Sequence, residues 1–142
     1  MKRIIFILLA FVIFSSSALA EGIPSAVVGG LRGKGAAVGL DFTEYFNWSG
    51  LYFGPGIELC TGSQFLILYF DARATVNRVY EDTFLFFKGG ATALIGSESL
   101  LGINFLVGLE SLFDIKPLFV EFGVDATKDA GLILQAGYKF TF

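Results

Sequence analysis

The sequence contains no histidine among its 142 residues and only one cysteine, Cys60. The lack of histidine excludes the histidine-based catalytic triads and removes the commonest metal ligand of proteins. A single cysteine cannot form an intramolecular disulfide, and we expect Cys60 to be a small buried residue rather than a functional thiol. The sequence therefore predicts no enzyme, no cofactor and no metal site.

Long apolar runs are also missing, except at the N-terminus. Lys2 and Arg3 precede an apolar run of about 11 residues, 4–14, and small residues follow as far as Ala20. This is the pattern of a cleaved export signal, because a helix needs about 20 apolar residues to span a membrane. We expect a signal peptide at residues 1–20 and one mature domain at residues 21–142.

Basic residues are scarce in the remaining chain of about 122 residues, which carries 8 basic and 13 acidic side chains. A net charge near −5 leaves no basic face of the kind that nucleic acid requires, so we expect no nucleic-acid partner. Apolar residues nevertheless make up 54% of the sequence, and aromatic residues 16%. So much apolar surface without a spanning helix fits a β-barrel whose outer wall meets lipid.

Apolar and polar side chains alternate along residues 131–142, where Leu132, Leu134, Ala136, Tyr138, Phe140 and Phe142 share one parity. Period-two alternation indicates a strand. It recurs at residues 35–44, 51–61, 65–76, 83–94, 101–110 and 118–126, with lengths near the 9–11 residues that cross a bilayer. An eighth strand is assigned to residues 22–30. It rests on the even strand number of bacterial barrels and on the need for closure, since its own alternation is poor.

Charged residues take the parity opposite to the apolar one. The predicted interior charge network comprises Asp41, Glu58, Asp71, Arg73, Lys88, Glu110, Glu121, Asp125 and Lys139. Buried charges are costly unless they are paired, so we expect a hydrogen-bonded plug rather than paired catalytic acids. A turn centred near residues 79–80 would place Asp71 opposite Lys88. Arg73 should then contact Glu110 or Asp41, and the inward parity of Phe84 and Phe86 makes residues 83–94 less regular.

Aromatic residues gather near turns predicted at residues 45–49, 77–82 and 113–116, on the side of the chain's C-terminus. They predict a girdle at a membrane interface, formed by Tyr45, Phe46, Trp48, Tyr80, Phe113 and Phe142. The glycine-rich residues 29–35 superficially suggest a phosphate loop. They lack the Gly-Lys-Ser/Thr ending and a following helix, and we interpret them as a hairpin turn.

The last strand, with Tyr138, Phe140 and Phe142, resembles the C-terminal strand of bacterial outer-membrane β-barrels, which typically ends in Phe after alternating aromatic or apolar residues. The mature chain as a whole resembles the small OmpA/OmpX-like barrels. This resemblance implies an all-β fold, a closed antiparallel transmembrane β-barrel of eight strands, in the bacterial outer membrane. It also implies contact with the lipid bilayer and with the outer-membrane assembly machinery, for which Tyr138, Phe140 and Phe142 would be the assembly signal.

An eight-stranded barrel has an interior that side chains just fill. We therefore expect a structural, membrane-integrity role and not a diffusion pore. Two alternatives stay open. A lipid-modifying barrel enzyme would need a polar constellation on the outer or upper rim, and none is recognisable. An exported, soluble, lipocalin-like barrel that binds an apolar ligand would turn the apolar parity inward.

Overall fold

A computed structural model describes residues 22–141, so the predicted signal peptide (1–20) and Phe142 lie outside the described residues. The described part consists of strands: β1 (Pro24–Arg32), β2 (Gly35–Asp41), β3 (Phe46–Trp48), β4 (Leu51–Cys60), β5 (Gln64–Tyr80), β6 (Thr83–Gly96), β7 (Leu100–Leu112), β8 (Ile115–Ala126) and β9 (Ala130–Thr141). Within it, no helix has the length and hydropathy to cross a membrane.

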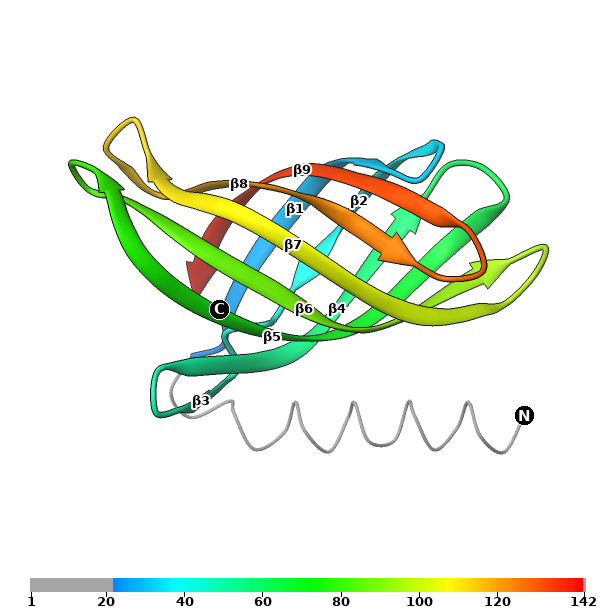
Figure 1. The fold of residues 1–142 in the computed structure, drawn as a ribbon, viewed down its shortest axis with the longest axis horizontal. Helices are drawn as coiled ribbons and strands as arrows, with labels where there is room; N and C mark the ends of the chain where they lie inside the picture. Colours follow the sequence, from blue (N-terminus) through cyan, green and yellow to red (C-terminus); the bar gives the residue numbers. More distant parts are fainter. Residues whose placement is uncertain (1–21, 142) are drawn as a thin grey trace.

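The strands close into one antiparallel barrel (Figure 1). Consecutive strands pair from β4 to β9, β9 pairs with β1, and β1 pairs with β2. Pairing of β2 with β4 completes the ring, so eight strands build the wall. The short β3 lies outside this ring and pairs with β4 as a hairpin. The predicted closed barrel of eight antiparallel strands is confirmed.

The two ends of the barrel differ. At the first end β1 begins and β9 ends, close to the β3–β4 hairpin and the tips of the β5–β6 and β7–β8 hairpins, toward the left in Figure 1. We call this the terminal end. The opposite end carries the connections at residues 33–34, 61–63, 97–99 and 127–129. We call it the vestibule end, after a cavity described below.

Several predicted turns are wrong in extent. Residues 77–82 were predicted as a turn, but β5 continues to Tyr80 and its turn contains only residues 81–82. The reason is two irregularities in the β5–β6 pairing, one between Thr75 and Asn77 and one between Arg78 and Tyr80. Each bulge inserts an extra residue and shifts the alternation of side chains. The alternation of apolar and polar residues is therefore interrupted in the sequence, although β5 and β6 remain paired up to the turn.

Three other predicted turns also contain paired residues, so the strands beside them are longer than predicted. Residues 29–35 were predicted as a hairpin turn, but β1 extends to Arg32 and only residues 33–34 turn. Residues 45–49 contain β3, and the β7–β8 turn is limited to residues 113–114. The eighth strand predicted at residues 22–30 is β1, displaced by two residues toward the C-terminus.

Side chains alternate across the wall as the sequence predicts. On β8 and β9, Val120, Phe122 and Leu134 are 37%, 51% and 49% exposed, whereas the neighbouring Phe119 and Glu121 are only 2% exposed. Leu118 and Phe140, on the same outward parity, are half-buried. The apolar parity thus forms the outer wall, which is the opposite of what the lipocalin-like alternative requires.

Candidate functional site: the charged interior

The nine charged residues predicted for the interior all lie on the inward side of the wall. Glu110 and Lys139, nearest the terminal end, are half-buried. The other seven are buried: Asp41, Glu58, Asp71, Arg73, Lys88, Glu121 and Asp125. Most of them meet in three clusters along the barrel, and two further charged residues, Arg32 and Glu44, belong to these clusters.

The Arg32 cluster lies toward the vestibule end. The Arg32 guanidinium donates two hydrogen bonds of 2.8 Å to the carboxylate of Asp125 and one of 2.8 Å to Glu58 Oε1. Gln135 Nε2 donates to the other oxygen of Glu58, over 2.7 Å. The planar guanidinium suits such bidentate pairing with a carboxylate. Arg32 was missed because the predicted turn at residues 29–35 included it.

The Lys88 cluster crosses the middle of the barrel from β6 to β2 and β8. Lys88 Nζ lies 2.7 Å from Asp41 Oδ2 and 2.9 Å from both carboxylate oxygens of Glu121. Asp41 Oδ1 accepts hydrogen bonds from the backbone N–H and the hydroxyl of Thr43, over 2.7 and 2.5 Å. One ammonium therefore serves two buried carboxylates on different strands.

The predicted pair between Asp71 and Lys88 is wrong. In the β5–β6 pairing Asp71 lies opposite Gly90, and Lys88 lies opposite Arg73. The register is displaced by two residues because the turn is centred later than predicted and the hairpin contains bulges. Lys88 nevertheless points inward, where it finds its carboxylate partners across the lumen instead of on the adjacent strand.

The Arg73 cluster lies toward the terminal end and joins two cations to two carboxylates. Arg73 pairs with Glu44, over 2.7 Å, and with Glu110, which is one of its two predicted partners. Lys139 Nζ also contacts Glu44 and Glu110, over 2.6 and 2.5 Å. Glu44 lies in the connection between β2 and β3, because β2 ends at Asp41 and not at residue 44 as predicted. Its role was missed because in the predicted strand it shared the outward parity of Leu40 and Phe42. The Arg73 guanidinium lies 3.9 Å from the ring centre of Phe86.

The described interior contains more carboxylates than cations. Four cations, Arg32, Arg73, Lys88 and Lys139, share six carboxylates in the three clusters, and Asp71 is a seventh. Asp71 is 0% exposed, and neither of its carboxylate oxygens has a hydrogen-bond partner in the described part of the chain. Ion pairs therefore connect the strands across the interior, and the described interior has more acidic than basic groups.

Two cavities adjoin the charged clusters. One of about 620 Å³ opens at the vestibule end, and its lining includes Arg32, Asp125 and the half-buried Cys60. Cys60 is therefore less buried than predicted. The other, about 20 Å³, lies between the Lys88 and Arg73 clusters and has room for about one water molecule. Because Arg32 is already paired with two carboxylates, the larger cavity offers no free guanidinium to a ligand.

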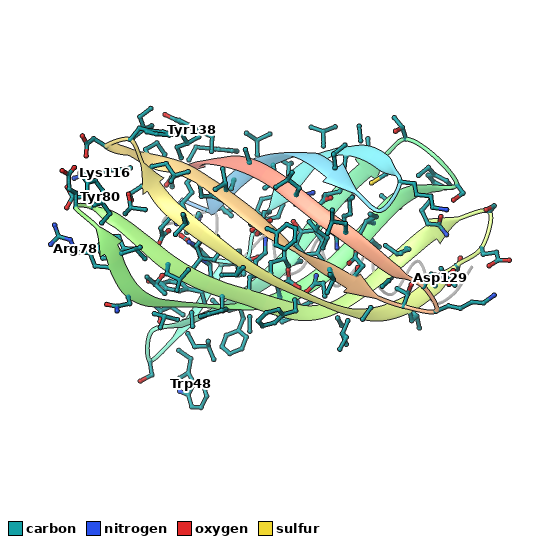
Figure 2. All side chains as sticks on the ribbon, turned by 45° about the horizontal axis from the view of Figure 1, so that its top comes forward. Trp48, Arg78, Tyr80, Lys116, Asp129 and Tyr138 are labelled. Atoms are coloured by element: carbon teal, nitrogen blue, oxygen red, sulfur yellow. The ribbon has the colours of Figure 1, made fainter. Side chains whose placement is uncertain are left out.

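The described residues predicted for a girdle, Tyr45, Phe46, Trp48, Tyr80 and Phe113, lie at the terminal end, and Phe142 lies outside the described residues. Trp48, Tyr80 and Phe113 are 74%, 69% and 85% exposed, and Phe46 is 40% exposed. Tyr45 packs edge-on against Phe46 at 4.6 Å between ring centres. Figure 2 shows Trp48 pointing away from the barrel below the wall, and Tyr80 at the tip of the β5–β6 hairpin.

Comparisons of this chain with protein families, with curated proteins and with solved structures find no match. Its function is therefore inferred from the distribution of charged and apolar side chains over the two faces of the barrel wall.

Proposed function

We propose that this chain is a small outer-membrane β-barrel with a filled, charged interior and a structural role in the membrane. The observation that carries the proposal is the inverted distribution of side chains. Charged residues are buried inside the barrel, and large apolar residues are exposed on its outer wall. In water this arrangement is unfavourable, whereas in a bilayer it places each kind of residue in a suitable environment.

The exposed apolar surface continues around the barrel, because every wall strand contributes to it. One outward side chain from each strand, in chain order, is 37–60% exposed: Val27, Val38, Leu59, Phe70, Phe87, Phe105, Phe122 and Leu134. Water-soluble monomers rarely expose contiguous apolar patches of more than a few hundred Å². A closed apolar belt of this kind matches the lipid-facing wall of a membrane barrel.

The terminal end supplies the second argument. Exposed aromatic side chains are favourable at the boundary between lipid and water, and Trp48, Tyr80 and Phe113 all lie at this end. We infer that they form an interfacial girdle on the periplasmic side. The export signal expected at residues 1–20 and the assembly signal expected at Tyr138, Phe140 and Phe142 support the same location, with the outer-membrane assembly machinery as a partner.

A structural role follows from the ion pairs that cross the lumen. Arg32 joins β1 to β4 and β8, and Lys88 joins β6 to β2 and β8. Ion pairs that cross the lumen in this way obstruct the passage of solutes. They also engage the six described carboxylates of the three clusters, and among the described interior carboxylates only Asp71 is left without an ion pair. We therefore favour a structural barrel over a pore or a lipid-modifying enzyme.

Trp48 provides the test, because it is the only tryptophan of the chain. The purified chain is refolded into vesicles whose lipids carry bromine either near the headgroup or deep in the acyl chain. We expect Trp48 fluorescence to be quenched strongly by the shallow bromine and weakly by the deep one. A Trp48→Phe variant, which must fold alike, supplies the blank. A chain that stays soluble without detergent and shows no quenching by either lipid would overturn the proposal.

A further inference from the structure

The vestibule is the cavity of about 620 Å³ that opens at the vestibule end, and its size suits a small organic molecule. Ligand cavities in proteins usually enclose about 300–1,000 Å³. We infer that the vestibule binds a small aliphatic amine of the diamine or polyamine class. The inference concerns the mouth of the barrel and is independent of what surrounds the outer wall.

The vestibule is open because one inward glycine has no large side chain in front of it. Deeper in the barrel, an aromatic ring covers each of three inward glycines, so that an added Cβ would lie within 2.2 Å of the ring: Gly56, Gly108 and Gly137. A Cβ on Gly131, which lines the vestibule, would lie 3.4 Å from Gly33 Cα and 3.9 Å from Asp125 Cβ. Both are ordinary van der Waals distances, so the space beside Gly131 can hold part of a ligand.

The inner end of the vestibule does not suit an anion. Arg32 and Asp125 line it there and are at most 5% exposed, and the Arg32 guanidinium is shared between Asp125 and Glu58. One cation therefore faces two carboxylates. An anionic ligand would meet this excess of negative charge in a region from which water is largely excluded, where like charges repel more strongly than in water.

The rim of the vestibule adds charges that are free to meet a ligand. Glu98, Asp129 and Lys34 line the cavity, and none of them forms an ion pair with another described residue. Together with the inner end, two cations face four carboxylates. A cleft lined mainly by one sign of charge concentrates ligands of the opposite sign. The vestibule therefore favours a positively charged guest.

The apolar part of the lining indicates which kind of cation fits. Ile67, Leu94 and Leu100 also line the vestibule and offer contact to a methylene chain. The carboxylates can accept charge-assisted hydrogen bonds from ammonium groups. A bare metal ion is disfavoured, because no three acidic or cysteine side chains of the described chain are grouped as such a site requires. A diamine or polyamine, with ammonium groups joined by methylene chains, matches both kinds of lining.

Cys60 provides the assay, because the only cysteine of the chain also lines the vestibule. The refolded full chain in an uncharged detergent is treated with methyl methanethiosulfonate, a neutral thiol reagent, and modification of Cys60 is followed by mass spectrometry. The probe is putrescine, a linear diamine, at constant pH and ionic strength. An amine that occupies the vestibule should slow the reaction about tenfold at a concentration about ten times its Kd. Glucose, which is neutral, and glutarate, a dianion of similar length, should not slow it.

Urea unfolding in the same solutions gives a second measurement. The midpoint should rise with putrescine, because a ligand of the folded chain stabilises it. The double variant Glu98→Gln/Asp129→Asn removes the rim carboxylates and should weaken both effects. Asp82→Asn, which removes an exposed acid at the terminal end, should leave them unchanged. Gly131→Leu keeps every charge but fills the space beside residue 131, and it should abolish the rise in midpoint.

Several results would overturn the inference. Equal Cys60 rates and equal midpoints with and without putrescine exclude an amine site. Equal slowing by glucose or glutarate shows that the vestibule does not select cations. A putrescine effect that persists in Gly131→Leu places the amine on surface charges outside the vestibule. If Gly131→Leu does not fold, an equal loss of the effect in Asp82→Asn and in Glu98→Gln/Asp129→Asn has the same meaning.

Discussion

Replacing Lys88 by methionine should be among the most destabilising single changes in the barrel. The substitution retains most of the side-chain volume and removes only the ammonium that contacts Asp41 and Glu121. The three side chains are 3%, 7% and 1% exposed, so water cannot easily replace the lost contact. Breaking a buried ion pair from one side costs about 3–5 kcal/mol, because the remaining charge is left without compensation. We expect a loss in this range for Lys88→Met.

The two carboxylates should not contribute equally to this loss. Asp41 keeps two hydrogen bonds from Thr43, whereas both oxygens of Glu121 depend on Lys88 Nζ. Adding Glu121→Gln to Lys88→Met should therefore recover more stability than adding Asp41→Asn. The triple variant, with all three charges removed, leaves no uncompensated buried charge and should therefore be more stable than Lys88→Met alone.

The assay is urea-induced unfolding of the refolded protein in lipid vesicles, followed by Trp48 fluorescence. The control is Arg78→Met, which breaks an ion pair with Asp82 whose side chains are 60% and 65% exposed. This exposed pair should contribute less than about 1 kcal/mol. A loss for Lys88→Met as small as that for Arg78→Met would refute the reasoning. A triple variant no more stable than the single one would refute it too.

Three further changes test the packing, assembly and orientation of the barrel. Gly137→Ala would place a Cβ 2.1 Å from Phe119 Cζ and should cost about 1–3 kcal/mol in urea unfolding, whereas Gly29→Ala, with its nearest contact at 3.6 Å, should cost little. Deletion of Phe142 should reduce membrane yield and the heat-modifiable form in gels, and unchanged values of both would contradict its role in assembly. Cys60, the only cysteine, lies at the vestibule end and should react in intact cells with a membrane-impermeant maleimide. A thiol that reacts only after the cells are opened would reverse the proposed orientation.

The fold was predictable because the wall of a barrel imposes a local rule on the sequence. Every second side chain faces the same side, so the parity of Leu132, Leu134 and Ala136 could be read without knowing any neighbour strand. The same rule identified the charges that lie inside. The alternation would also have placed Arg32 inside the barrel, because Arg32 shares its parity with the buried Ala26 and Val28. That signal was overlooked because the surrounding glycines suggested a turn.

The partners of the interior charges could not be predicted in the same way. Lys88 and Asp41 are 47 positions apart and belong to β6 and β2, which are not adjacent. Which groups meet across the lumen depends on the tilt and stagger of all eight strands, and these are properties of the closed barrel. A bulge in one hairpin changes them without a clear trace in the sequence. The Asp71–Lys88 prediction failed for this reason, since it assumed a regular hairpin.

The apparently irregular residues of the interior follow a second rule, which links large side chains to glycines. Phe86 lies opposite Gly108, Phe119 opposite Gly137, and Tyr69 opposite Gly56. A Cβ on any of these three glycines would lie within 2.2 Å of the opposing ring. Each ring therefore occupies the space that its cross-strand neighbour leaves free. The glycines on the inward parity are thus part of the packing, and their pairing with large residues explains how a narrow barrel holds both aromatic rings and three ion-pair clusters. The inward Phe86 is compatible with a polar interior, because its ring also packs against the guanidinium of Arg73.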